Sequence, residues 1–389
     1  MKLTITRIEL VRAIAAVKPV ANGTLPILSN LLLVANEKSV TLTACDGDLH
    51  LRVKAGATVA EPGRTTLRAG LLHEIARNAT GEAVSLHLVR NTLHVECGTV
   101  RFKLATVDAD DFPPFPRLKD AAGFALKQAD FRSMLSRTAF ATSRDEERIV
   151  FNGSLISLNG RLNVAACDGR RLGLVEAPPP DAGEDMKLDK FDLILPAKAV
   201  RELLRLLGTG EDAGKVAVAA TKNLAQFTLG DVTVLSALIG GDYPDFRKII
   251  PKSDTPVASI QRIDLLHAVE LVALVADAVK LDFRKQNLLI SSARVTGDKK
   301  DSFGDASDNL LCAAARELSI KLSAEYLRDA LNACTADEVQ LFANADGTIA
   351  LLRSPSENWL SVIAALNDAP AEAPKAPAKP EAKPAEARK

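Results

Sequence analysis

Three stretches of the chain repeat one helical pattern at a nearly constant interval. They are Leu67–Arg77, Leu195–Arg205 and Leu322–Asn332, which start 128 and then 127 residues apart. A second motif agrees with this interval, because Cys45–Gly47 recurs 122 residues later as Cys167–Gly169. Self-similarity at a fixed period reflects architecture, and a few large tandem copies favour a ring or an arc over a single active-site cleft. The sequence therefore predicts one domain written three times.

Length and charge agree with this reading. A chain of 389 residues is too long for one hydrophobic core and suits three domains of about 100–150 residues. Lys+Arg and Asp+Glu both total 49, so the formal net charge is zero. Because no field of the whole molecule attracts nucleic acid or a membrane, a polyanion site has to be a local segregation of charge.

The N-terminus has no charged lead followed by a long apolar run, and no apolar stretch of 18 residues occurs, so we predict a cytoplasmic protein. No Cys-x-x-Cys pair occurs either, and no disulfide framework, metal site or cofactor is expected. The five cysteines are interpreted as small buried apolar groups. They are Cys45, Cys97, Cys167, Cys312 and Cys334.

The C-terminal two dozen residues contain almost only Ala, Pro, Lys and Glu and are predicted to be a flexible tail. Without them the remaining chain divides by three into about 122 residues, which matches the spacing of the Asp-Gly motifs. The predicted boundaries are domain 1 at 1–120, domain 2 at 121–250, domain 3 at 251–367 and a disordered tail at 368–389.

Each repeat alternates amphipathic helices with runs of short strands. The first helices are expected at Arg7–Lys18, Ala129–Ala141 and Arg262–Val275, and the second helices at the repeated stretches. Strands follow each helix, which makes each domain two βαβββ halves of an α+β fold with helices on one face of antiparallel sheets. The expected strands include Leu28–Ala35, Val40–Ala44, Val84–Val89, Thr92–Cys97, Val100–Thr106, Val150–Leu158, Leu162–Ala166, Val279–Phe283 and Leu288–Ser292.

Basic side chains recur on the predicted helices opposite the apolar stripe. On Leu195–Leu207, Lys198, Arg201 and Arg205 lie on the side away from the leucines. Arg12, Arg132 and Arg137 are placed similarly on other helices; the alternative is an ordinary solvated face. In the third repeat, Leu271 and Leu274 replace arginines there, which indicates either a partner surface or a helix buried on both sides.

Enzymatic motifs are absent from the sequence. It has no phosphate-binding glycine loop, no His-Glu-x-x-His and no nucleophile elbow, and the histidines lack metal-ligand spacing. His87 and His94, in predicted neighbouring strands, are interpreted as sheet-surface residues. We find no catalytic set and predict that the chain is not an enzyme; an active site between repeats is the remote alternative.

Several motifs in this order resemble the bacterial DNA polymerase III β subunit family, the β sliding clamps. They are Thr24–Leu33, Asn152-Gly153, Ala166–Leu172 and Tyr243–Pro251, with a weaker match at Asp264–Leu266. The resemblance covers nearly all of residues 1–366. It implies a ring-shaped, head-to-tail homodimer of six domains around double-stranded DNA, with helices inside and sheets outside.

A ring that slides needs diffuse contacts with phosphates, because specific base contacts would pin it. The resemblance implies a processivity factor in DNA replication and repair that binds DNA independently of sequence. The residues expected to line the bore are Lys198, Arg201, Arg205, Arg12, Arg132, Arg137 and Arg77. Leu271 and Leu274 are assigned to the dimer interface.

The family also docks short peptides of the DNA polymerase III catalytic subunit, the clamp loader and repair polymerases in a groove between the second and third domains. The matching positions here are Phe151, Cys167, Gly169, Arg170, Arg171, Leu172, Pro244, Lys248, Ile249, Val362, Ala364 and Leu366. The chain departs from the family at its end, where Ala364 stands in place of a large Met. A divergent second clamp with narrowed partners, serving repair, a mobile element or inhibitor resistance, is therefore the alternative.

Overall fold

The structure is a computed structural model, and it describes residues 1–119, 121–180, 191–253, 255–293 and 304–366. The predicted tail at 368–389 lies outside these residues. The chain forms two compact units. Unit 1 comprises Met1–Ile250, Asn332–Ala336 and Leu352–Val362, and unit 2 comprises Pro251–Leu331, Asp337–Leu351 and Ile363–Lys389.

The first sheet of unit 1 is antiparallel and has alternating burial, as a sheet with one solvated face requires. Leu3 and Ile5 of β1 are buried, whereas Lys2, Thr4 and Thr6 are exposed. In spatial order its strands are β5 (Thr58–Glu61), β1 (Lys2–Thr6), β7 (Ala83–Val89), β8 (Thr92–Cys97) and β9 (Val100–Ala105).

A second sheet of unit 1 joins the first and second repeats. Strand β17 of the second repeat pairs with β4 of the first, from Val232 opposite Val53 to Ser236 opposite Leu49. The spatial order is β10 (Ala122–Lys127), β15 (Lys215–Ala220), β16 (Leu224–Leu229), β17 (Val232–Ala237), β4 (Leu49–Gly56), β3 (Ser39–Cys45), β2 (Asn30–Asn36) and β6 (Gly63–Arg68).

The remaining strands of unit 1 form the most deeply buried layer. Every residue of β11 and β12 is buried, which fits strands covered on both faces. The order is β14 (Phe191–Pro196), β11 (Gly153–Leu158), β12 (Leu162–Cys167) and β13 (Arg171–Ala177), next to β25 (Trp359–Ala364), of which residues 359–362 belong to this unit.

Unit 2 contains a four-stranded antiparallel sheet in the order β21 (Ser307–Leu311), β20 (Asn287–Ala293), β19 (Ala278–Arg284) and β22 (Leu318–Ser323). Its other strands are β18 (Ala258–Gln261), paired with β23 (Glu338–Ala343), and the first part of β24 (Ile349–Arg353). Leu281 and Ile290 face each other in the buried core of the four-stranded sheet.

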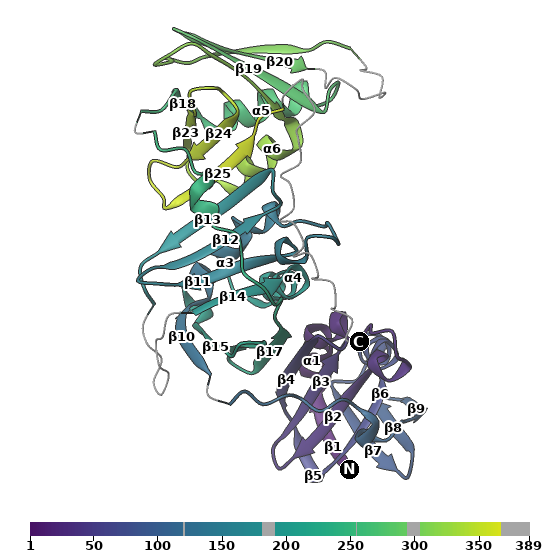
Figure 1. Cartoon of the computed structure of the whole chain (residues 1–389). Helices are drawn as coiled ribbons and strands as arrows, with labels where there is room; N and C mark the ends of the chain where they lie inside the picture. The colour runs from purple at the N-terminus through teal and green to yellow at the C-terminus, as the bar shows by residue number, and fades with distance from the viewer. Residues whose placement is uncertain (120, 181–190, 254, 294–303, 367–389) are drawn as a thin grey trace, which may run out of the picture. The chain divides into compact units, whose positions relative to one another are not determined.

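In the part of the chain that the structure describes, each of the six helices directly follows a strand, and each such βα unit is continued by further strands (Figure 1). This order confirms the predicted α+β fold with two βαβββ halves in each repeat. The helices are α1 (Arg7–Val17), α2 (Ala69–Asn78), α3 (Gln128–Ser136), α4 (Ala197–Leu206), α5 (Arg262–Val272) and α6 (Ala324–Ala333). No helix of the described residues has the length and apolarity to span a membrane.

Element ends differ from the predictions where side chains or proline intervene. Helix α3 ends five residues before the predicted Ala141, and the hydroxyl of Thr138 donates to the carbonyl oxygen of Met134 at its C-terminal end. Helix α4 begins at Ala197 because Pro196 closes β14 in an extended conformation. The predicted strands at Leu28 and Val150 begin later, after the short 3₁₀ turns Pro26–Ser29 and Ile149–Phe151.

Candidate functional site

Helix α4 separates an apolar face from a basic one, as predicted. Val200 and Leu203 are buried, whereas Arg201 is exposed. Within the described chain Arg201 makes no hydrogen bond or ion pair. Its guanidinium group is therefore available to an external anion.

The other two predicted cations of α4 contact the first repeat. The ammonium group of Lys198 pairs with the carboxylate of Asp46, whose side chain is only 5% exposed. Arg205 donates to the carbonyl oxygens of Ala15 and Ala16 near the C-terminal end of α1, and pairs with Glu202 on its own helix. Cations stabilise the negative end of a helix dipole. These two side chains thus fasten the two repeats together.

The remaining predicted bore residues differ in whether their guanidinium groups can reach an external anion. They are Arg12, Arg77 and Arg132. Arg12 is exposed and pairs with Glu9 on α1 at 2.7 Å; the hydrogen bonds that its guanidinium donates to the Glu9 carboxylate raise the pKa of Arg12. Arg77 is exposed in the last turn of α2 and has no hydrogen bond or ion pair among the described residues. Arg132 is half-buried and donates to the carbonyl oxygen of Leu207 at 3.2 Å.

The prediction that Arg137 projects from an exposed helical face is wrong. Its side chain is 11% exposed, pairs with Glu357 and donates to the carbonyl oxygen of Ala333 at 3.2 Å. Its own carbonyl oxygen accepts from the indole N–H of Trp359 at 3.1 Å. Because α3 ends at Ser136, Arg137 leaves the helical face and enters the interior of unit 1.

The repeated Asp-Gly motif is the same turn in both copies. The Asp168 carboxylate accepts from the backbone N–H groups of Arg170 and Arg171 at 2.8 and 2.9 Å, and pairs with the Arg171 side chain at 3.0 Å. Asp46 accepts in the same way in the first repeat. Gly169 has a φ of +90°, and a Cβ there would lie 2.7 Å from the guanidinium of Arg148. The positive φ therefore favours glycine at position 169, because side chains are strained in that backbone conformation.

The predicted groove residues of unit 1 divide into a surface and a supporting layer. Gly169, Arg170, Pro244, Lys248 and Ile249 are exposed, and Phe151 and Arg171 are half-buried. Three other predicted groove residues are buried in the chain: Cys167 is 6%, Leu172 0% and Val362 3% exposed. Their contact with a peptide stays a prediction. Ala364 and Leu366 are half-buried residues of unit 2.

An aromatic cluster that the sequence reasoning missed supports this surface. Tyr243 lies edge-on between Phe151 and Phe246, with ring centres 5.9 and 6.5 Å apart. Burial raises the pKa of Tyr243, so its phenol stays protonated. Burial likewise raises the pKa of Cys167 and keeps it a thiol. The Tyr-Pro-Asp-Phe run was the available signal, since aromatic residues are scarce in this chain.

Helix α5 and the turn that follows it each carry one exposed leucine, Leu271 and Leu274 respectively. Leu271 is 46% and Leu274 75% exposed, whereas Leu265 and Val269 are fully buried. The alternative of a helix buried on both sides is therefore wrong within this chain. Other exposed apolar side chains were missed from the sequence, among them Leu71 on α2, Phe102 on the edge strand β9 and Leu311 on the edge strand β21.

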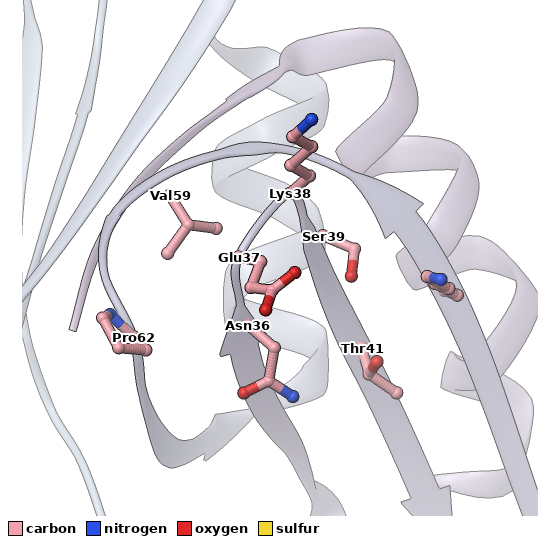
Figure 2. A pocket seen from close by; sticks show the side chains of 8 residues that line it. Asn36, Glu37, Lys38, Ser39, Thr41, Val59 and Pro62 are labelled. Atoms are coloured by element: carbon pink, nitrogen blue, oxygen red, sulfur yellow. The ribbon is translucent and has the colours of Figure 1, made fainter.

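Two open hollows lie in the first repeat. The larger, about 800 Å³, is lined by the β2–β3 turn at residues 36–39, with Lys54, Val59 and Pro62 (Figure 2). The other, about 660 Å³, lies between the end of α1 and the start of α2 and includes Lys18, Arg68 and His73. Among the described residues no cluster of three or more His, Cys, Asp or Glu side chains could hold a metal.

Comparison with known families identifies this arrangement. Residues 1–116, 125–245 and 247–365 match, in order, the models of the N-terminal, central and C-terminal domains of the DNA polymerase III beta subunit. The chain belongs to the DNA polymerase III β subunit family. Membership confirms the resemblance and accounts for the threefold repeat, since each copy matches a different domain of one family.

Similar proteins are β sliding clamps. The chain is 28% identical to the beta sliding clamp of Pseudomonas putida over 93% of this chain and 98% of the relative, and 30% identical to that of Proteus mirabilis over 88% and 92%. The crystal structure of the DNA polymerase III subunit beta from Pseudomonas aeruginosa superposes with a TM-score of 0.86 at 26% identity, covering 94% of this chain and 100% of that one. The chain is thus a DNA sliding clamp, and no comparison favours a specialised paralogue.

Proposed function

We propose that two copies close head to tail around duplex DNA and, without catalysis of their own, tether the replicative polymerase in the cytoplasm. The main support is that helices of two different repeats each expose an arginine that has no partner among the described residues, Arg77 on α2 and Arg201 on α4. Diffuse cationic contacts hold phosphates without reading bases, which a sliding protein requires. We keep 1–120, 121–250 and 251–367 as the proposed domains.

Arg12 and Arg132 are proposed to assist as weaker phosphate contacts, because each already has a partner in the chain. Lys18 and Arg68, which line the hollow between α1 and α2, add positive charge to the same pair of helices. Lys198 and Arg205 are proposed to act mainly by joining the first two repeats, and Arg137 has no direct DNA contact in this proposal.

Arg77→Ala and Arg201→Ala are each expected to reduce the salt dependence of DNA affinity. Since each lost phosphate contact removes about one released counterion, the slope of log K against log salt should fall by about 1 per copy. The measurement is a titration of short duplex DNA at several salt concentrations. Lys222→Ala, which removes an exposed cation from a turn between β15 and β16, should leave the slope unchanged.

We propose that a second copy of the chain covers Leu271 of α5 and Leu274 of the turn after it. A closed two-membered ring uses one pair of unlike surfaces twice. Leu271 and Leu274 supply one surface, and the exposed apolar side chains Leu71 and Phe102 are proposed to belong to the complementary one. Among the described residues, β9 and β21 each lie at the edge of a sheet, so we propose that the two edges pair between copies.

Peptide segments of the DNA polymerase III catalytic subunit, the clamp loader and repair polymerases are the proposed ligands of the surface around the Asp168 turn. Ile249, Pro244 and Phe151 offer apolar contact, and Arg170 and Lys248 offer charge at its margin. Such surfaces gain affinity from apolar anchors and orientation from the charged rim. The contributions of Ala364 and Leu366 remain predictions from the family resemblance.

Ile249→Asp is expected to weaken binding of a polymerase-derived clamp-binding peptide at least about tenfold, because a carboxylate would replace an apolar anchor. Fluorescence anisotropy of the labelled peptide measures this change. The matched control is Leu25→Asp, which alters another exposed apolar residue in the first repeat. Equal affinity of Ile249→Asp and the unsubstituted chain would exclude this surface as the docking site.

A further inference from the structure

The outer face of the first sheet brings two histidines together. Strands β7 and β8 are neighbours in the first sheet (Figure 1). His87 of β7 and His94 of β8 are direct cross-strand partners in it, so their side chains leave the sheet on the same face. The alternate residues Leu86 and Val95 are buried in the core, which puts both imidazoles on the solvated side. Both rings are half-buried and therefore accessible.

The ring nitrogens of the two imidazoles are available to bind a ligand. Their ring centres lie 6.3 Å apart with an angle of 43° between the planes, and neither ring has a hydrogen bond or ion pair within the described residues. With metal–nitrogen bonds of about 2.1 Å, two imidazoles on one tetrahedral ion have ring centres roughly 5 Å apart. A side-chain rotation that closes the separation by about 1 Å is sufficient, and exposed side chains change rotamer readily.

The neighbours on this face set the strength of binding. Lys2 and Lys103 extend the row on either side as register partners of His87 and His94, and both are exposed. Their ammonium groups oppose a bound cation, although their flexible stems let the charge move away into solvent. Glu96, on the same face two residues from His94, favours a cation, while Arg101 lies 3.6 Å from its carboxylate.

We propose that His87 and His94 form a two-histidine site for a divalent transition-metal ion of the Cu²⁺, Ni²⁺ or Zn²⁺ class, with water completing the coordination. Neutral imidazole suits these ions, and the antiparallel pairing of β7 with β8 supplies the chelate geometry. The bound ion cross-links two neighbouring strands on the outer face of the first sheet. The site is independent of the DNA-binding and peptide-binding residues proposed above.

Isothermal titration of the untagged full chain with Ni²⁺ tests the site. One ion per chain is expected, and His87→Ala and His94→Ala should each weaken binding at least about tenfold, because a single imidazole remains. His267→Ala, which removes a histidine of helix α5, is the matched control and should bind as tightly as the unsubstituted chain. Lys2→Gln with Lys103→Gln should bind Ni²⁺ more tightly, since two opposing charges are lost.

Two results would overturn the proposal. One is Ni²⁺ binding that persists unchanged when both histidines are replaced, which would place the ion elsewhere. The other is the absence of saturable binding up to millimolar Ni²⁺ in the unsubstituted chain. Thermal unfolding of each variant without metal shows whether the fold is retained, and paramagnetic resonance of bound Cu²⁺ should report two nitrogen ligands that drop to one in either single variant.

Discussion

Leu271→Asp together with Leu274→Asp is expected to convert the proposed dimer into a monomer. Each leucine contributes about 1.5–3 kcal/mol when its side chain is buried, so the dissociation constant should rise by at least about 100-fold. Carboxylates at the same place add the cost of burying charge. Sedimentation measures the change in mass, and retention on circular DNA should be lost with it, because an open arc cannot stay topologically linked.

Ile249→Asp serves as the control, since it places the same charge on an exposed apolar position of the peptide surface. It should remain a dimer and stay on circular DNA while losing peptide affinity. A dimer that survives the Leu271→Asp and Leu274→Asp substitutions would show that the exposed leucines have another partner.

Arg137→Ala is expected to destabilise unit 1 by about 3–5 kcal/mol, because it leaves the partly buried carboxylate of Glu357 without its partner. The side chain also loses its hydrogen bond to Ala333, next to the indole of Trp359. Since Trp359 is the only tryptophan, its fluorescence during denaturant unfolding reports on this region directly.

The comparison is Arg148→Ala, which breaks an exposed pair with Asp145 whose side chains are 52% and 37% exposed. Such pairs contribute about 0–1 kcal/mol, so its unfolding midpoint should hardly move. If both variants lose similar stability, burial of the Arg137 pair is not what makes it important.

The threefold repeat made it possible to predict the fold from the sequence. Each βαβββ half carries its own periodic signals, and six similar halves reinforced one another, so helix α4 and its basic face were predicted nearly to the residue. Helix ends were less accessible. A hydroxyl at Thr138 and a proline at 196 decide where α3 stops and α4 starts, and both act through local backbone chemistry rather than periodicity.

Predicting the site was harder because burial depends on distant segments. The ion pair of Arg137 with Glu357 could not be predicted from the residues around Arg137, because Glu357 lies 220 residues later. The same holds for Lys198 and Asp46, and for Leu172, which has the right position in the motif but lies under the surface. His87 and His94 are adjacent only through strand register, so spacing along the chain gave no metal-ligand pattern.

The pairing of β17 with β4 has a mechanical consequence. Five successive residue pairs tie the second repeat to the first, and Ala237 N–H continues the seam by donating to the Asp48 carbonyl oxygen at 2.8 Å. Bending the chain at this pairing would strain all of these hydrogen bonds at the same time, instead of breaking them one after another. We therefore expect the first two repeats to move as one rigid body. If the proposed ring opens, the opening should occur at the ends of this body and not at the pairing of β17 with β4.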